Sequence, residues 1–138
     1  MNFEKIVLLI DDDEDDLQML EEALNIIDGE HKTIQANNGL EGLKVLEDLQ
    51  NENSLPCLIV LDINMPKMDG KQTFIAIKSI KKLASIPIVI FSTSTSLMDR
   101  TFFERHNTAY SVKPINFTGF AITASRMINA CYHRTTKQ

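Results

Sequence analysis

The stretch CLIVLDINMPKMDG, residues 57–70, decides how the rest of the chain is interpreted. It opens with an unbroken apolar run, Leu58 to Leu61, that is β-branched at its centre. Such a run is typical of a strand buried on both faces of a parallel sheet. The run stops at Asp62, and a loop punctuated by proline and glycine follows. Since ligands bind at the carboxyl ends of parallel strands, we interpret Asp62 as a reactive group.

Four other segments have the composition of strands: residues 6–10, 33–36, 88–91 and 109–112. The second and the fourth of these are only weakly apolar. Three of the four run directly into polar groups, which are Asp11 and Asp12, Ser92, and Lys113. Polar side chains therefore recur at one position, the carboxyl end of a predicted strand.

Amphipathic helices are predicted between the strands, because apolar residues recur there at spacings of three and four. The acidic residues 13–16 are interpreted as a helix N-terminus, where the helix dipole favours negative charge. The alternation of strands and helices, with no repeat and no linker, predicts a single doubly wound α/β domain with helices on both faces. We assign residues 1–138 to this domain, with a core at about 4–131 and a polar tail at 132–138.

The composition is that of an ordinary soluble globular protein, with 43% apolar and 24% charged residues. A net charge of −5 argues against a general nucleic-acid or anionic-membrane binder. No apolar run approaches the roughly 18 residues of a membrane helix. With no targeting signal in view, we expect a cytoplasmic protein and no membrane association.

The cysteines and histidines carry no motif. Cys57 and Cys131 lie far apart in the sequence, and without a secretory signal they are expected to be reduced, packed thiols. His31, His106 and His133 stand away from the acidic clusters, and we expect them at the surface.

The polar residues at the strand ends would form one chemical site if their strands are neighbours in the sheet. Asp11, Asp12 and Asp62 would then form a carboxylate cluster, which is unfavourable unless a cation lies among them. Oxygen ligands that leave room for water suit Mg²⁺. Ser92 and Lys113 would be partners for phosphoryl oxygens. Phosphoryl transfer needs positioning and charge neutralisation, and this set supplies both.

Four motifs resemble the receiver domain of two-component response regulators: LLIDDD (8–13), LDINMPKMDG (61–70), IPIVIFST (86–93) and VKP (112–114). They occur in order over nearly the whole chain, which is far more specific than any one of them. The resemblance implies a flavodoxin-like sheet of order 2-1-3-4-5. It is closest in kind to stand-alone receivers, such as the chemotaxis regulators.

The resemblance also implies roles for single residues. Asp62 would be the phosphoacceptor and Asp12 the direct Mg²⁺ ligand, with Asp11 assisting through water. Asn64 would offer its backbone carbonyl to the metal. The run Asp11–Asp13 leaves the register of the acid pair open, and we choose the first two because they directly follow the strand.

A second group of residues would report or tune the phosphorylated state. By resemblance, Ser92 is the switch hydroxyl, Lys113 pairs with the phosphoryl group, and the orientation of Tyr110 reports the state. Asn64 and Ser94 would set the lifetime of the phosphoryl group. A cis Lys113–Pro114 bond is expected as in relatives. The Gly-Ala common before the fifth strand is replaced by Asn107-Thr108-Ala109.

The implied partners are a sensor histidine kinase and either a downstream target protein or a histidine phosphotransfer protein. No direct nucleic-acid contact is expected, and homodimerisation is left open. The chain would not be an enzyme beyond its own phosphorylation and dephosphorylation. Two alternatives are a haloacid-dehalogenase-type phosphatase, which wants an aspartate where Asn64 stands, and a constitutive binding module that takes no phosphate.

Overall fold

A computed structural model describes the backbone of residues 5–136 and the side chains of residues 5–131. The strands are β1 (Lys5–Ile10), β2 (His31–Ala36), β3 (Leu58–Leu61), β4 (Ile88–Ser92) and β5 (Ala109–Val112). The helices are α1 (Glu14–Ile27), α2 (Gly39–Asn51), α3 (Gly70–Ser79), α4 (Leu97–Arg105) and α5 (Phe117–Thr136). Every described element is one that the alternating pattern predicts. The helix α5 extends into the segment assigned to the polar tail.

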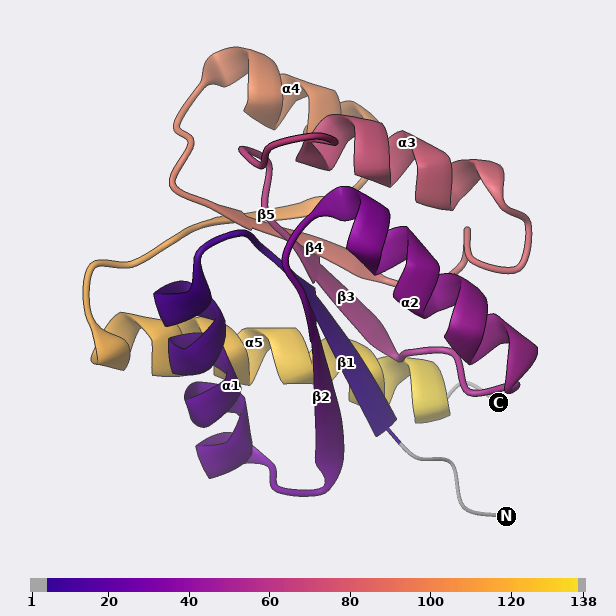
Figure 1. Ribbon diagram of the computed structural model, residues 1–138. Coiled ribbons are helices and arrows are strands. Elements are labelled where there is room, and N and C mark those ends of the chain that lie inside the picture. Colours follow the sequence, from indigo (N-terminus) through magenta and orange to yellow (C-terminus); the bar gives the residue numbers. More distant parts are fainter. Residues whose placement is uncertain (1–4, 137–138) are drawn as a thin grey trace.

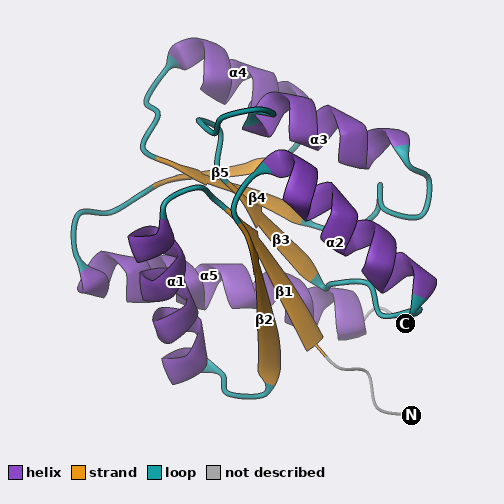
Figure 2. Ribbon diagram, viewed as in Figure 1, coloured by secondary structure: helices purple, strands orange, loops and turns teal. Residues whose placement is uncertain are grey.

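The strands form one parallel sheet in the order β2-β1-β3-β4-β5, which confirms the predicted fold class. Helices α2, α3 and α4 cover one face of the sheet, and α1 and α5 cover the other (Figures 1 and 2). Because both faces are covered, the central strands are buried at every residue except Lys5 at the start of β1. The prediction of a doubly wound sheet with helices on both faces is therefore confirmed.

The core lies in two clusters on opposite faces of the sheet. Side chains alternate along β1, so this strand contributes residues to both clusters. Val7 and Leu9 pack against α1 and α5, whereas Leu8 and Ile10 face α2 and α3. Each fully buried aliphatic side chain contributes about 1.5–3 kcal/mol relative to an exposed one. The sheet is thus held from both sides, and its strand ends are fixed in place.

Side-chain caps set the starts of the helices that leave the carboxyl edge of the sheet. Asp13 accepts from the backbone N–H of Asp16 at the start of α1, as the acidic run predicts. Asp69 caps α3 and forms a capping box with Gln72. Ser96 caps α4. These caps satisfy backbone donors that the first helical turn leaves unpaired.

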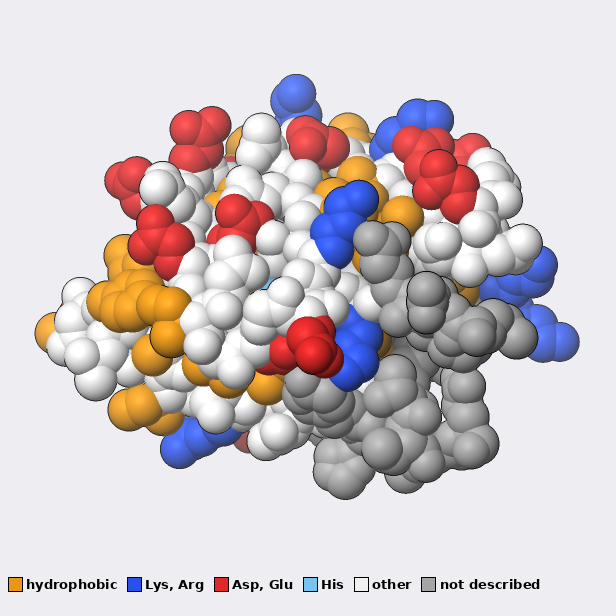
Figure 3. All heavy atoms as spheres, turned by 90° about the horizontal axis from the view of Figure 1, so that it is seen from below, with side chains coloured by type: hydrophobic (Ala, Val, Ile, Leu, Met, Phe, Trp, Pro, Cys, Tyr) orange, Lys and Arg blue, Asp and Glu red, His pale blue; other side chains and the backbone are white. Residues whose placement is uncertain are grey.

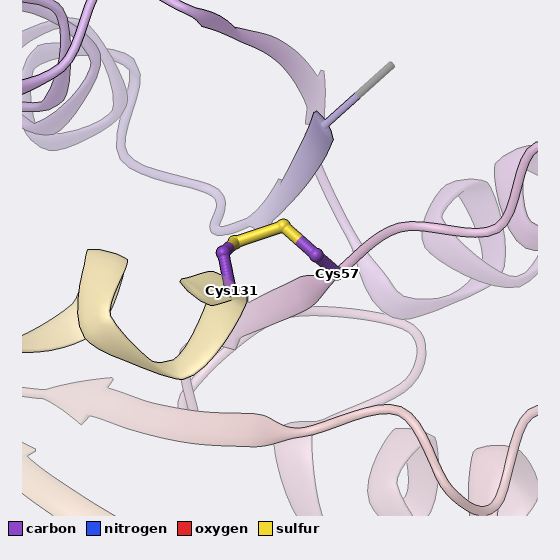
Figure 4. Close-up of a disulfide and its surroundings, with 2 residues drawn as sticks. All are labelled: Cys57 and Cys131. Carbon is purple, nitrogen blue, oxygen red and sulfur yellow. A yellow bond between two sulfur atoms is a disulfide. The ribbon is translucent and has the colours of Figure 1, made fainter. Parts of the chain in front are cut away.

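The two cysteines form a disulfide, so the expectation of reduced thiols is wrong for this structure (Figure 4). Cys57 directly precedes β3, and its backbone N–H donates to Ile6 O at 2.8 Å. Cys131 lies near the end of α5, and α5 packs against the same face of the sheet. Packing of α5 brings the two Cα atoms within 4.8 Å across a sequence separation of 74 residues, which sequence distance alone does not reveal.

Two of the histidines have described side chains, and they differ. His31 is buried at the start of β2, and neither ring nitrogen has a hydrogen-bond partner, so its predicted surface position is wrong. His106 is exposed as predicted, with Nδ1 beside Phe102 O at 2.7 Å. The side chain of His133 lies outside the described residues. Within residues 5–136, no helix combines the length and apolar character needed to cross a bilayer.

Candidate functional site

The sheet ladder continues past the strand ends and fixes the backbone of the predicted site residues. The N–H of Asp11 donates to Ala36 O at 3.0 Å, and the N–H of Asp62 donates to Ile10 O at 3.0 Å. The N–H of Lys113 donates to Ser92 O at 2.9 Å. Each of these residues is therefore the first after its strand and is still held by the neighbouring strand. The loops that lead to α1 and α5 leave this same edge (Figure 1).

The register brings the predicted carboxylates together. Ile10 of β1 is paired with Leu61 of β3, so the residues that follow them emerge side by side. Asp11, Asp12 and Asp62 each offer an oxygen atom, and these atoms all lie within 4.8 Å of one another. Asp11 and Asp62 are buried, whereas Asp12 is exposed. This hard-oxygen donor set, open to water on one side, fits a divalent cation such as Mg²⁺.

Lys113 reaches the cluster from the far side of the sheet edge, as predicted. Its Nζ lies 2.7 Å from Asp11 Oδ2 and 3.7 Å from Asp62 Oδ2, and its side chain is only 5% exposed. It also lies 2.8 Å from Asp16 Oδ2. Sequence reasoning gave Asp16 only a dipole role and missed this ion pair. The signal available was its place in the first turn of a helix that begins beside Asp11.

Burial and neighbouring charges shift the pKa values of Asp11 and Lys113. Burial, together with the negative charge of Asp62, raises the pKa of Asp11 to about 7, although the Lys113 ammonium and the Asp13 N–H oppose the rise. Burial alone would lower the pKa of Lys113, but its hydrogen bonds to Asp11 and Asp16 and the charge of Asp62 raise it. Lys113 is therefore cationic at neutral pH, and the carboxylates outnumber it.

The loop from β3 to α3 holds Asp62 against a glycine. The N–H of Ile63 donates to Asp62 Oδ1 at 2.8 Å, and the N–H of Gly70 donates to Ile63 O at 2.7 Å. A Cβ at Gly70 would lie 2.3 Å from Asp62 O and 2.6 Å from Ile63 Cα. Only glycine allows this approach of two backbones. Asn64, in the same loop, is exposed.

Ser92 and the loop after β4 border the same edge. The Ser92 side chain is fully buried, and its Oγ accepts from the N–H of Ser94 at 3.2 Å. The hydroxyl of Tyr110 donates to Ser94 O at 2.8 Å, and the Tyr110 side chain is half-buried. Ser94 is partly buried. The structure thus connects three residues that the sequence assigned separately to switching and lifetime.

Two backbone features near β5 concern the comparison with the receiver-family pattern. The Lys113–Pro114 peptide bond is trans, so the expected cis bond is wrong; Lys113 nevertheless reaches the carboxylates. Asn107 has a φ of 53°, in the left-handed region. Asparagine tolerates this region better than most residues, which explains how the turn before β5 forms without glycine.

This sheet edge, with an acidic pocket facing a buried lysine, defines a receiver, the domain class that takes up a phosphoryl group in two-component signalling. The chain belongs to the response regulator receiver family, because the sequence profile described as "Response regulator receiver domain" matches residues 7–120. It is a signalling domain, and phosphoryl acceptance with Mg²⁺ is general in this family. The family also implies interaction with a histidine kinase.

Individual relatives agree with this membership. The chain is 34% identical over 115 residues to the response regulator Rcp1 of Synechocystis sp., covering 81% of this chain and 78% of Rcp1. A crystal structure of the phosphorylated cyanobacterial phytochrome response regulator RcpA superimposes with a TM-score of 0.81 at 28% identity, covering 89% of this chain and 90% of RcpA. The Mn²⁺-bound form of Rcp1 gives a TM-score of 0.76 at 28% identity, covering 88% and 90%.

Other curated relatives match this chain over less than half of their own length. The chain is thus similar to one part of these longer regulators. The matched family is that of receivers, rather than that of haloacid-dehalogenase phosphatases, which was one of the two alternatives.

We expect the stability of the metal-free protein to fall as pH rises from about 4 to about 7. Unfolded Asp11 releases its proton near 3.8, but folded Asp11 does so at about 7. In that window the folded state binds more protons than the unfolded state, so the free energy of unfolding decreases with pH. Above this window a divalent cation offsets the uncompensated carboxylate charge, and Mg²⁺ should stabilise the protein most there.

The measurement is the melting temperature in EDTA and in Mg²⁺ across this pH range, for the wild type and for Asp11→Asn. The variant should show a flatter decline in EDTA and a smaller gain from Mg²⁺. Asp15 is exposed and lies in the first turn of α1. Asp15→Asn serves as the control, and its melting temperature should change with pH as that of the wild type does. Equal slopes for the wild type and Asp11→Asn would contradict the assigned cause.

Proposed function

We propose that Asp62 is the residue on which this receiver takes its phosphoryl group, donated by the phosphohistidine of a sensor histidine kinase. The observation that carries the proposal is the pocket around Asp62 Oδ2. Lys113 Nζ lies 3.7 Å from this oxygen, and one carboxylate oxygen each from Asp11, Asp12 and Asp62 lie within 4.8 Å of one another. A nucleophilic carboxylate, a cation and a divalent-ion site are thus assembled at one point. This is the set that phosphoryl transfer requires.

The contacts of the site residues support the following proposed roles. A carboxylate oxygen of Asp62 forms the bond to phosphorus, while the phosphorus–nitrogen bond of the donor breaks and its electron pair returns to the imidazole. Asp11, Asp12, Asp62 and the backbone carbonyl of Asn64 would hold Mg²⁺, which when bound neutralises charge on the phosphoryl oxygens. Lys113, held at the rim by Asp11 and Asp16, presents its ammonium group to the same oxygens.

Phosphorylation then acts as a switch of conformation. The Ser92 hydroxyl is drawn toward the phosphoryl group, and the loop after β4 and Tyr110 adjust with it. The populations of two arrangements of α4, β5 and α5 change, and with them the affinity for a partner. That partner is a downstream target protein or a histidine phosphotransfer protein. Because histidine kinases draw their phosphoryl group from ATP, the proposed location of the protein is the cytoplasm.

The surface around the junction of β5 and α5 is suited to binding a protein. Exposed apolar side chains lie there, namely Val112, Ile115, Phe117 and Ile122. Figure 3 shows hydrophobic side chains gathered at one end of the face seen from below, where Figure 1 places the start of α5. Apolar patches of this kind mark interaction sites on soluble proteins.

Asn64 and Ser94 are proposed to set the lifetime of the phosphoryl group. Each lies two residues beyond a site residue, Asp62 and Ser92 respectively. Asn64 is exposed, so water can reach its side chain. Substitution of either residue should change the rate of dephosphorylation with little effect on Mg²⁺ affinity, because neither side chain belongs to the carboxylate cluster.

The experiment that tests the proposed function is phosphorylation by acetyl phosphate, followed by mass spectrometry of the intact protein. We expect one phosphoryl group per chain in Mg²⁺ and none in EDTA. Labelling that is equally fast in EDTA would contradict the metal-dependent mechanism. A protein that is folded, as shown by circular dichroism, yet takes no label in Mg²⁺ would instead favour the constitutive binding module.

A further inference from the structure

Asp16, in the first turn of α1, binds the buried lysine of the site from outside the described carboxylate cluster. Its Oδ2 accepts from Lys113 Nζ at 2.8 Å, across 97 residues of sequence. The Lys113 side chain is only 5% exposed, and that of Asp16 is 22% exposed. Lys113 Nζ also lies 2.7 Å from Asp11 Oδ2 and 3.7 Å from Asp62 Oδ2. Of these three carboxylates, Asp11 and Asp62 belong to the cluster, whereas Asp16 does not.

The backbone at the start of α1 fixes the position of Asp16. Asp13 Oδ1 accepts from the N–H of Asp16 at 3.1 Å, and the N–H of Asp13 donates to Asp11 Oδ1 at 3.0 Å. Asp11 Oδ2 in turn contacts Lys113 Nζ, so Asp11, Asp13, Asp16 and Lys113 form a closed ring of contacts. The N-cap holds the first helical turn in place. Asp16 is therefore a fixed partner for a lysine side chain that is flexible by itself.

An ammonium group and a divalent cation compete for the same carboxylates, because each neutralises their charge. Lysine has three N–H donors on a flexible four-carbon stem, so Nζ moves toward the carboxylates within its reach. If the Asp16 carboxylate is removed, the charge partners that the structure gives to Lys113 are Asp11 and Asp62. Both belong to the cluster. The ammonium group would then bind the cluster more tightly and would weaken its affinity for a divalent cation.

We propose that Asp16 is a positioning residue that holds the Lys113 ammonium group at the border of the carboxylate cluster and so keeps the cluster available to Mg²⁺. This role rests on the proposed function, which assigns the cluster to Mg²⁺ and Lys113 to the phosphoryl oxygens. Asp16 acts through Lys113 and is not itself a metal ligand, because it lies outside the described cluster. Loss of its carboxylate therefore lowers the affinity for Mg²⁺ only while Lys113 is present.

The test is the dissociation constant of Mn²⁺, measured from the electron paramagnetic resonance signal of the free ion, and that of Mg²⁺, measured by competition. We expect Asp16→Asn to bind Mg²⁺ at least three-fold more weakly than the wild type, because Lys113 is released onto Asp11 and Asp62. The fold should survive, since the N-cap binds the backbone N–H of Asp16 and not its side chain. Circular dichroism checks this, and Asp16→Ala is the second variant.

Two controls separate the ion pair from the loss of a charge. Asp16→Glu keeps a carboxylate within reach of Lys113 and should bind Mg²⁺ within two-fold of the wild type. Asp15→Asn removes the same charge from the same helical turn at an exposed position, and it should also bind within two-fold of the wild type. The titrations are made at physiological ionic strength, where exposed charges more than about 8 Å apart are largely screened.

A double-mutant cycle with Lys113→Met tests whether Asp16 acts through the lysine. Lys113→Met removes the competing cation, so its affinity for Mg²⁺ should be at least that of the wild type. In this background, Asp16→Asn should change the affinity by less than two-fold. Wild-type affinity in both Asp16→Asn and Asp16→Ala, or an equal loss with and without Lys113, would overturn the inference. A wild type that binds neither Mn²⁺ nor Mg²⁺ would instead refute the divalent-cation site of the proposed function, and the inference with it.

Discussion

Asp62→Asn is expected to abolish labelling by acetyl phosphate in Mg²⁺, because an amide nitrogen or oxygen does not replace a carboxylate as the nucleophile. The substitution keeps the size of the side chain, and Asn Oδ1 can still accept from the N–H of Ile63, which lies 2.8 Å from Asp62 Oδ1. The fold should therefore survive. The measurement is intact-protein mass spectrometry with tryptic mapping of the modified peptide.

The matched control for this prediction is Asp15→Asn, an exposed carboxylate in the first turn of α1 outside the described carboxylate cluster. It should label at the wild-type rate. Lys113→Met should label slowly, since the ammonium group that faces Asp62 is lost. Undiminished labelling of Asp62→Asn, at any residue, would show that the phosphoacceptor has been assigned wrongly.

Loss of the disulfide is expected to lower the free energy of unfolding by about 4 kcal/mol. The cross-link spans a sequence separation of 74 residues. Closing a loop of that length lowers the conformational entropy of the unfolded chain and so raises its free energy by about 4 kcal/mol. Chemical denaturation of the oxidised wild type with and without a thiol reductant measures the effect. The midpoint should move to lower denaturant in the reductant.

A variant lacking both thiols, Cys57→Ala with Cys131→Ala, provides the control. Its unfolding should not respond to the reductant, and its stability should be no greater than that of the reduced wild type. The folded state should persist in the variant because the surrounding core, including Leu58, Val60 and Ile128, is intact. Identical midpoints for the oxidised and reduced wild type would show that the cross-link contributes nothing measurable.

The sequence predicted the fold well because its strongest signals are local. Apolar runs that stop at polar groups, as at Leu61 and Asp62, mark strands and their carboxyl ends without any knowledge of the partner strands. The strand order came from the family resemblance, and the structure agrees with it. The same local signals placed Asp11, Asp12 and Lys113 at one edge, where the structure brings their side chains together.

What the sequence did not predict depends on contacts between distant segments. The Cys57–Cys131 disulfide needs α5 to pack against β3, and the burial of His31 at the start of β2 depends on the tertiary fold. The contacts of Asp16 with Lys113 and of Asp99 with Lys71 join helices to residues far away in the chain. Side-chain partners of this kind follow from packing, which no local pattern encodes.

The disulfide also divides the chain topologically. It closes a covalent ring from Cys57 to Cys131 that carries Asp62, Ser92 and Lys113. Asp11 and Asp12 lie outside the ring, on the arm ahead of Cys57, which carries β1 and β2 and meets the ring where β1 pairs with β3. A single proteolytic cut inside the ring leaves the two fragments joined, whereas a cut ahead of it releases the arm. The acidic pocket is therefore assembled only when this arm docks onto the ring.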